Sequence, residues 1–398
     1  ARCSGGARRG ASSQRDKRLS SSENSRTGTF GKERLMKLKT PVEVKSWRKS
    51  TRAMGSALAL PIFLLLASEP EAAKETENYE PNSRTFEFVY ASTIGPIEAG
   101  QGPVEVFVPL PRTDPYQRVL SLDVTANVPG QIEEEAKYGN RYWRGSLEKS
   151  TGESIEVEVR AVISRSGFDS LNAEESSRGA GEFDPQLFLS ANSRVVVDHP
   201  ILDPIRQEVR ASAPSADKAT LARAIYDWVV DNVEYKKVGK GWGNGDTFWA
   251  CNERYGNCTD FHSLYISLAR SEGIPARFEM GFPIPEDRAS GNIEGYHCWV
   301  EFYLPGEGWT AIDASEASKA PEKRDAFYGG RAGDRIYLTT GRDLRLGEHH
   351  RSRSLNYFIY PYIEVAGEEY AGPVRRSVRF SEIHRQAAAA EPFFHGTR

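Results

Sequence analysis

The sequence predicts an α+β fold in which a β-sandwich-like domain, residues 84–200, precedes a core of helices and strands, residues 215–345. Two observations carry this prediction. Short runs that alternate apolar and polar residues fill residues 84–165, and alternation with a period of two is typical of antiparallel strands. From residue 216 the apolar period becomes helical, and further strand-like runs follow the helices, which indicates an α+β arrangement.

The strand-like runs of the first domain are short and are separated by Pro, Gly and Asn, which favour turns. They are Thr85–Tyr90, Val104–Val108, Val119–Val124 and Ile155–Val162.

The core begins with a predicted helix over residues 216–233, in which Leu221, Ile225 and Trp228 share one face and Ser215 is the expected N-cap. A loop is expected over 238–257. The next elements predicted are a helix at Thr259–Ser271 and strands at Ala276–Gly281, Tyr296–Tyr303 and Trp309–Ile312. Residues 346–398 are expected to form a strand at 355–365 and a polar tail that frays from Arg375.

The charge of the chain is unevenly distributed. Residues 1–53 hold 15 of the 52 Lys and Arg residues but only 4 of the 55 Asp and Glu residues, so the remainder has 37 basic and 51 acidic residues. An acidic body argues against nucleic acid as a partner, because phosphate binding requires clustered Lys and Arg. Residues 1–52 are therefore predicted to be a basic, disordered leader.

Residues 53–73 resemble a secretory signal peptide. Lys45, Lys49 and Arg52 precede an apolar run, AMGSALALPIFLLLA, and small residues follow it. The run is short for a bilayer-spanning helix. We therefore expect an exported protein, periplasmic or extracellular, with no stable membrane span after removal of the signal.

Cys258 is the first candidate catalytic residue. It lies where a glycine-containing loop enters the predicted helix, in the run YGNCTD. A thiol at a helix N-terminus is stabilised as the nucleophilic thiolate by the positive end of the helix dipole. Taken alone, the segment fits a buried structural cysteine equally well.

His297 and Asp313 complete a possible catalytic set. His297 lies on a predicted strand, in GYHCWVE, and Asp313 follows the next strand, in WTAID. A short connection through Pro305 and Gly306 is expected to bring the carboxylate to the imidazole, where it would fix the tautomer. A nucleophile, a base and a group that orients the base are the general signature of covalent acyl transfer.

Three blocks of sequence, residues 256–281, 295–303 and 308–316, resemble the transglutaminase-like superfamily. The family places Cys, His and Asp on three successive segments in this order. The resemblance covers about residues 215–345 and implies a papain-like core, a thiol mechanism and no required metal or cofactor. The resemblance implies that Cys258, His297 and Asp313 occupy the three catalytic positions of the family. Family members are similar to crosslinkers, peptidases, amidases and inactive binding modules, so the reaction stays open.

The oxyanion hole is predicted to include the backbone N–H of Cys258. The resemblance implies a second donor upstream, sometimes an indole N–H. Trp242, Trp249 and Asn252 are the candidates, and packing within the loop is the alternative for each.

Cys251 and Cys298 are predicted to form a disulfide that leaves Cys258 free, since an exported protein with three remaining cysteines has one pair at most. Two buried apolar thiols are the alternative. A zinc site is a third option, although its spacing does not match a CxxC-type site. That set would contain Cys251, Cys258, His262, His297 and Cys298.

The favoured function is a thiol-dependent enzyme that acts on peptide or amide bonds, with hydrolysis preferred over crosslinking because no acyl-acceptor site is evident. Its partners would be protein or peptide substrates, including cell-wall peptides. The alternative is a non-catalytic binding or scaffold protein built on the same fold.

Overall fold

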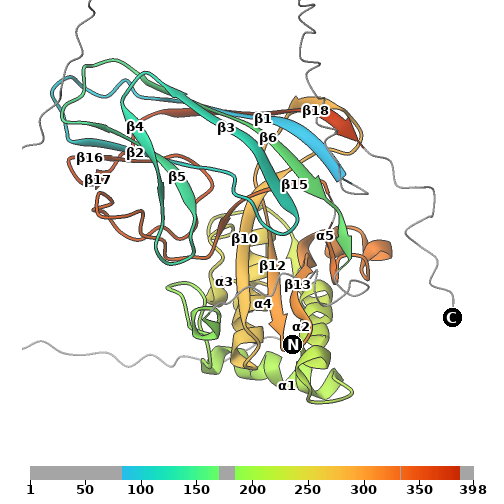
Figure 1. Ribbon diagram of the computed structural model, residues 1–398. Coiled ribbons are helices and arrows are strands. Elements are labelled where there is room, and N and C mark those ends of the chain that lie inside the picture. Colours follow the sequence, from blue (N-terminus) through green and yellow to red (C-terminus); the bar gives the residue numbers. More distant parts are fainter. Residues whose placement is uncertain (1–82, 170–183, 332, 386–398) are drawn as a thin grey trace, which may run out of the picture. The chain divides into compact units, whose positions relative to one another are not determined.

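The computed structural model describes residues 83–169, 184–331 and 333–385 of the chain (Figure 1). The predicted leader, residues 1–52, and the signal-peptide-like segment, residues 53–73, lie outside these ranges. None of the described helices combines the length and the apolar character needed to cross a membrane.

Two five-stranded antiparallel sheets form the β-rich region. The first has the order β11-β18-β1-β6-β3, with bounds Ser290–Asn292, Val374–Arg385, Ser83–Ile94, Ile155–Ser166 and Gln117–Ala126. The second has the order β17-β16-β2-β5-β4, with bounds Glu368–Glu369, Tyr362–Val365, Val104–Pro109, Arg141–Leu147 and Gly130–Glu134. Both sheets contribute apolar side chains to one hydrophobic core, Phe88 from β1 and Val106 from β2 among them.

The C-terminal segment corrects one expectation. The predicted strand at 355–365 is confined to β16, and the basic stretch from Arg375 does not fray but forms β18, paired with β1 on one side and β11 on the other. Val378 and Phe380 of β18 are buried, whereas Arg379 between them is exposed. Arg375 and Arg379 therefore lie on the face of β18 opposite to Val378 and Phe380.

A four-stranded antiparallel sheet forms the second part of the fold, in the order β13-β12-β10-β15. Its strands span Gly308–Ile312, His297–Leu304, Ala276–Pro283 and Arg335–Thr340. The sheet is joined to the β-rich region by packing and by hydrogen bonds. The ring of Phe282 lies 5.9 Å from that of Phe88, and the Gln117 side chain bonds to both the N–H and the C=O of Tyr337.

Four of the five α-helices, α1 to α4, follow β7 and precede β10 in the sequence, and α5 follows β13. They are α1 (Asp203–Ser212), α2 (Lys218–Asn232), α3 (Thr247–Glu253), α4 (Cys258–Ser271) and α5 (Ala314–Lys319). Short 3-10 helices span Pro185–Phe188, Pro200–Leu202 and Pro321–Lys323. Two small pairings complete the described strands, β7 (Phe168–Asp169) with β14 (Gly330–Arg331), and β8 (Glu234–Tyr235) with β9 (Tyr255–Gly256).

The α+β prediction is confirmed, but two local predictions are wrong. Asp217 rather than Ser215 caps α2, since its carboxylate accepts a hydrogen bond from the N–H of Thr220. The expected loop over 238–257 contains helix α3. Asp246 caps this helix, because its carboxylate accepts hydrogen bonds from the N–H groups of Phe248 and Trp249. Four of the five glycines that suggested a continuous loop precede this helix, and Gly256 follows it.

Helix α4 is buried along its whole length and packs against β10 and β12, with α2 and α5 beside it (Figure 1). Asn257 and Asp260 form a capping box at its start. Asp260 also accepts hydrogen bonds from the N–H groups of Gly243 and Gly245, at 2.6 and 3.0 Å. The glycine-rich loop is thereby tied to the first turn of the central helix.

Arg342, which follows β15, ties the same loop to the rest of the core. Its buried guanidinium donates to the carbonyl oxygens of Asn244 and Gly245, at 2.8 and 2.9 Å, and to Asn356 and Ser263. Gly245 has φ +58°, and a Cβ there would collide with this cluster. Arg342 therefore supplies a donor to the buried carbonyl of Gly245 and shares the carbonyl of Asn244 with the side chain of Asn356.

We expect Arg342→Ala to lower the free energy of unfolding by about 3 kcal/mol, because Gly245 O, Ser263 Oγ and Asn356 Oδ1 lose a charged donor. Denaturant unfolding followed by circular dichroism measures the change. Arg353→Ala is the matched control: its side chain is 80% exposed and pairs with Glu369, so its effect should stay within about 0.5 kcal/mol. Equal effects of the two substitutions would contradict the role given to Arg342.

Candidate active site

Cys258 is the first residue of α4, and its side chain is buried, with 3% of its surface exposed. The helix cap uses the amide groups that follow it: Thr259 donates to the Asn257 side chain, and Asp260 and Phe261 donate to the Asn257 carbonyl. The N–H of Cys258 has no acceptor within the helix. A thiol and an adjacent backbone donor thus share the positive end of the helix dipole.

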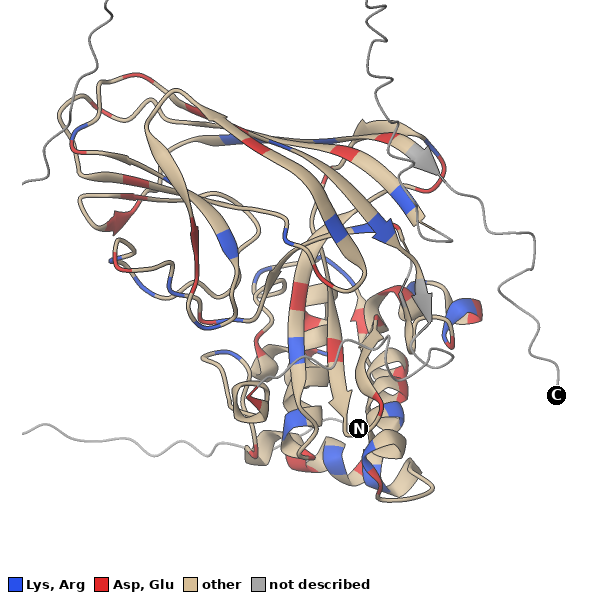
Figure 2. Cartoon of the chain, viewed as in Figure 1, with Lys and Arg blue, Asp and Glu red and all other residues tan. Residues whose placement is uncertain are grey.

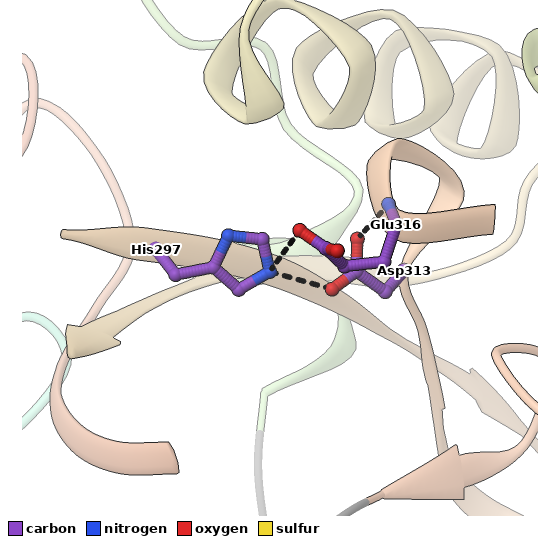
Figure 3. Close-up of side chains that lie close together, drawn as sticks. All are labelled: His297, Asp313 and Glu316. Atoms are coloured by element: carbon purple, nitrogen blue, oxygen red, sulfur yellow. Dashed lines mark hydrogen bonds and ion pairs between the residues drawn. The ribbon is translucent and has the colours of Figure 1, made fainter. Parts of the chain in front are cut away.

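His297 and Asp313 come from neighbouring elements and meet at the end of the sheet (Figure 3). His297 is the first residue of β12, and Asp313 follows β13 and caps α5. Nε2 of His297 lies 2.6 Å from Oδ2 of Asp313. Because Nε2 is occupied in this way, Nδ1 is the nitrogen left to interact with Cys258, which is among the groups that raise the pKa of His297. The structure therefore brings the three predicted residues together.

The Asp313 carboxylate is buried and fully engaged. Oδ1 accepts from the Ser315 hydroxyl at 2.9 Å and from the N–H of Glu316 at 3.0 Å. Oδ2 also pairs with the guanidinium of Arg335 at 2.8 Å. Burial raises the pKa of Asp313, but the charges of His297 and Arg335 outweigh it and hold the pKa well below its usual value.

The pKa values of His297 and Cys258 are shifted in opposite directions. Burial lowers the pKa of His297, but the charge of Asp313 and its hydrogen bond raise it to about 9. The neighbouring Cys298 thiol has the largest effect on Cys258 and lowers its pKa. Burial opposes that change and His297 reinforces it, so the pKa of Cys258 lies well below that of an ordinary thiol. The favoured state is a thiolate–imidazolium pair.

Aromatic residues surround the start of α4. The hydroxyl of Tyr296 bonds to Asn257 Nδ2 at 3.1 Å and to Thr259 Oγ1 at 3.0 Å. The rings of Tyr357 and Tyr360 each lie 5.9 Å from that of Tyr296. Tyr357 and Tyr360 lie in the segment 355–361, which was predicted to be a strand but precedes β16 in the structure. That segment instead supplies rings beside the candidate site.

Three residues near the site escaped the sequence analysis in this role: Arg335, His262 and Cys298. Arg335 lies 22 positions after Asp313, at the start of β15, and no motif links the two. His262, considered in the sequence only as a member of a possible zinc set, lies one helical turn after Cys258, and that spacing is the signal that could have placed it near the site. Cys298 directly follows the base, but its sulfur contacts Thr259 and His262 of α4 instead of a cysteine in a disulfide.

The predicted disulfide between Cys251 and Cys298 is accordingly wrong. Cys298 is a free thiol. It faces α4, whereas Cys251 lies in α3, so the two sulfurs do not meet as a disulfide requires.

The oxyanion candidates separate into two groups. Trp249 cannot supply its indole N–H, because that group donates to the carbonyl of Tyr255 at 3.0 Å. Trp242 is half-buried in the glycine-rich loop and Asn252 is exposed on α3. Both stay predictions.

The five residues weighed as a zinc set do not form a cluster of ligand atoms in the described part of the chain. The group of possible ligand atoms that lie within 4.8 Å of one another there consists of His297, Asp313 and Glu316 (Figure 3). Arg335 occupies the same carboxylate oxygen as His297. A guanidinium at that position repels a cation, so these residues do not fit a metal.

Comparisons with known proteins agree with this geometry. Residues 205–314 match the family model of the transglutaminase-like superfamily. A Haemophilus influenzae protein of unassigned function is 25% identical over 359 residues, covering 79% of this chain and 95% of that protein. A protein-glutamine gamma-glutamyltransferase of Pseudomonas aeruginosa is 32% identical over 91 residues, which are 21% of this chain and 14% of that enzyme.

A solved structure shares the fold over most of the chain. It comes from Cytophaga hutchinsonii and is described as a candidate cysteine protease. It superposes with a TM-score of 0.52 at 18% identity and covers 79% of this chain and 95% of its own. The predicted fold, a β-rich region before a papain-like core, is confirmed, and residues 205–314 of this chain form a transglutaminase-like domain.

Proposed function

We propose that this protein is a thiol-dependent acyl-transfer enzyme that acts on peptide or amide bonds, with Cys258 as nucleophile, His297 as acid and base, and Asp313 as the group that orients His297. The observation that carries the proposal is the 2.6 Å hydrogen bond from His297 Nε2 to a buried, doubly charge-paired Asp313. Cys258, at the start of α4, is among the groups that raise the pKa of the same imidazole.

In the first half-reaction, the Cys258 thiolate attacks the carbonyl carbon of the substrate. A carbon–sulfur bond forms and the carbonyl oxygen becomes an oxyanion, for which the N–H of Cys258 is a suitable donor. The carbon–nitrogen bond then breaks, and His297 transfers the proton on Nδ1 to the departing nitrogen. The products are a thioester on Cys258 and free ammonia or amine.

In the second half-reaction, the neutral His297 takes a proton from water, whose oxygen attacks the thioester carbon. The carbon–sulfur bond breaks, a carboxylic acid leaves, and the thiolate–imidazolium pair is restored. If an amine replaces water, the product is a new amide. Asp313 keeps Nδ1 directed at Cys258 throughout and stabilises each imidazolium.

Hydrolysis is the preferred outcome, because water is abundant and no acyl-acceptor site is evident in the sequence. Transamidation is the second candidate, and it is favoured by the name of the Pseudomonas aeruginosa relative. Protein or peptide substrates outside the cytoplasm fit the signal-peptide-like segment, residues 53–73. Acidic and basic residues are interspersed along the described strands and helices, which supports a protein substrate over nucleic acid (Figure 2).

We expect iodoacetamide to alkylate Cys258 rapidly at pH 6 and at a rate that is nearly independent of pH up to about 8. For an ordinary thiol, with a pKa of about 8.5, the fraction present as thiolate increases about tenfold per pH unit over this range, and the alkylation rate increases with it. In His297→Ala the alkylation at pH 6 should slow at least about tenfold, because the imidazolium that stabilises the thiolate is lost. Peptide mass spectrometry after brief labelling measures both rates.

His350→Ala is the matched control for that experiment. His350 is another buried histidine, which accepts a hydrogen bond from the N–H of Leu346 and is far along the chain from the site. Its loss perturbs packing without touching Cys258. If the wild type is alkylated slowly and His297→Ala is alkylated at the same rate, the proposed mechanism is contradicted. The alternative, a binding module built on this fold, would then be favoured.

A second prediction concerns the product. With a glutamine-containing peptide, the wild type should release ammonia and leave glutamate, and Cys258→Ala should release none. An added primary amine that enters the peptide in place of water would identify a transamidase. Ammonia assay and peptide mass measurement separate these outcomes. No turnover of glutamine peptides or of a peptide-bond library would contradict the proposal.

A further inference from the structure

Arg376 is a charged residue on the inward face of strand β18. It shares that face with Val378 and Phe380, which are buried, yet Arg376 itself is exposed. Glu382, further along the same face, is held by an ion pair of 2.9 Å with Arg84. Among the described residues, Arg376 has no such carboxylate partner. Ion pairing within the fold therefore does not explain its place on this face.

An aromatic ring holds the guanidinium of Arg376. Its Cζ lies over the ring of Tyr360, 3.8 Å from the ring centroid. Such a contact uses the flat face of the guanidinium and leaves the N–H groups at its edge able to donate. Tyr360 is half-buried, so the ring and the cation both reach the surface. A cation with a fixed plane and free N–H groups is suited to bind a carboxylate through two hydrogen bonds.

Two ring contacts connect this cation to the residues on either side of Cys258. The ring of Tyr360 meets that of Tyr296 edge-on, with 5.9 Å between the centroids. The Tyr296 hydroxyl is in turn hydrogen-bonded to the side chains of Asn257 and Thr259, at 3.1 and 3.0 Å. Only two tyrosine side chains therefore separate the cation from the neighbours of the nucleophile.

The segment just before His297 has open space beside it. A Cβ placed on Gly295 would meet no atom within 4 Å. Tyr296, the next residue, is half-buried and not enclosed. A peptide can therefore lie against this ring and that of Tyr360. Aromatic rings offer apolar contact to any peptide, so the choice among peptides depends on the charge nearby.

Arg376 supplies a charge that the proposed catalytic residues do not. In the favoured state Cys258 and His297 carry opposite charges, and Asp313 is paired with Arg335 at 2.8 Å. Such close pairs of opposite charge nearly cancel at the distance of a bound substrate. The guanidinium of Arg376 is therefore the group that attracts an anionic substrate.

We propose that Arg376 is a specificity-determining residue that binds a carboxylate of the substrate, while Tyr296 and Tyr360 support the neighbouring part of the peptide. The substrate class is a peptide with a carboxylate close to the reacting amide, on an acidic side chain or at the C-terminus. This inference deepens the proposed function and rests on it, because the peptide is the acyl donor that reacts with Cys258.

The test compares two electrophiles that differ in charge but little in size, iodoacetylglycine and iodoacetylglycinamide. Both are applied to the intact protein at pH 6, and peptide mass spectrometry measures the rates at which they alkylate Cys258. The ratio of the acidic to the neutral rate should fall about fivefold in Arg376→Gln, the effect of one exposed charge pair. The neutral rate should stay at its wild-type value. Arg376→Glu should lower the ratio further, because like charges repel.

A second pair of probes distinguishes the two sources of the carboxylate. Iodoacetyl-aspartic acid amide and iodoacetyl-asparagine amide differ only in the side chain, and both have a blocked C-terminus. An Arg376-dependent preference confined to this pair identifies an acidic side chain, and one confined to the glycine pair identifies a C-terminal carboxylate. Ratios that are equal in the wild type and Arg376→Gln for both pairs would overturn the proposal, and so would equal slowing of acidic and neutral probes.

Arg379→Gln is the matched control. Arg379 is an exposed arginine of the same strand, on the face opposite to Arg376, and its loss changes the net charge by the same amount. Its rate ratios should equal those of the wild type. A fall as large as that in Arg376→Gln would show a general effect of net charge and would refute a carboxylate contact at Arg376.

The failures of the two proposals are distinguishable. If the neutral probe alkylates the wild type quickly but the charge preference does not depend on Arg376, only this inference fails, and the thiol enzyme still stands. If the neutral probe alkylates Cys258 no faster than an ordinary thiol, the proposed function fails together with this inference.

Discussion

The interaction on which the site depends is the burial of one carboxylate, Asp313, among positively charged partners. An isolated buried carboxylate would take up a proton, since its ionised form is costly to remove from water. Here Arg335 and His297 share Oδ2, while Ser315 and the N–H of Glu316 satisfy Oδ1. The ionised carboxylate therefore persists, and its charge lets a buried imidazole hold a proton up to a pKa of about 9.

The elements of the core are arranged so that this charge acts on Cys258. The carboxylate caps α5 at the end of β13, Arg335 comes from β15, His297 from β12 and Cys258 from α4. Three strands and two helices thus meet at one point. The cap of α4 is fixed from the other side, because Asp260 and Arg342 both hold the loop around Gly245. The nucleophile consequently lies on a helix that is immobilised at its first turn, as a preorganised site requires.

The three candidate catalytic residues could be predicted from the sequence because each occupies a local context with a chemical meaning: a loop entering a helix, a strand, and the end of the next strand. The contacts of Arg335, His262 and Cys298 could not, since they depend on distances between elements that no spacing along the chain specifies. The disulfide failed for the same reason, as parity of cysteines says nothing about which face of β12 carries Cys298. The segment from Arg375 was wrongly predicted to fray because its basic residues conceal the alternation of Val378 and Phe380. Trp249 is not an oxyanion donor because its indole N–H donates to the nearby carbonyl of Tyr255.

The most direct test of this account is the pKa of His297 measured by NMR on protein with isotope-labelled histidine, in the wild type and in Asp313→Asn, with His297→Ala to assign the signal. The account predicts a pKa of about 9 in the wild type. In Asp313→Asn it predicts a fall toward or below the ordinary value of 6.5, because the charge that opposes burial is gone. A pKa that is the same in both proteins would show that Asp313 does not hold the imidazolium, and would contradict the account.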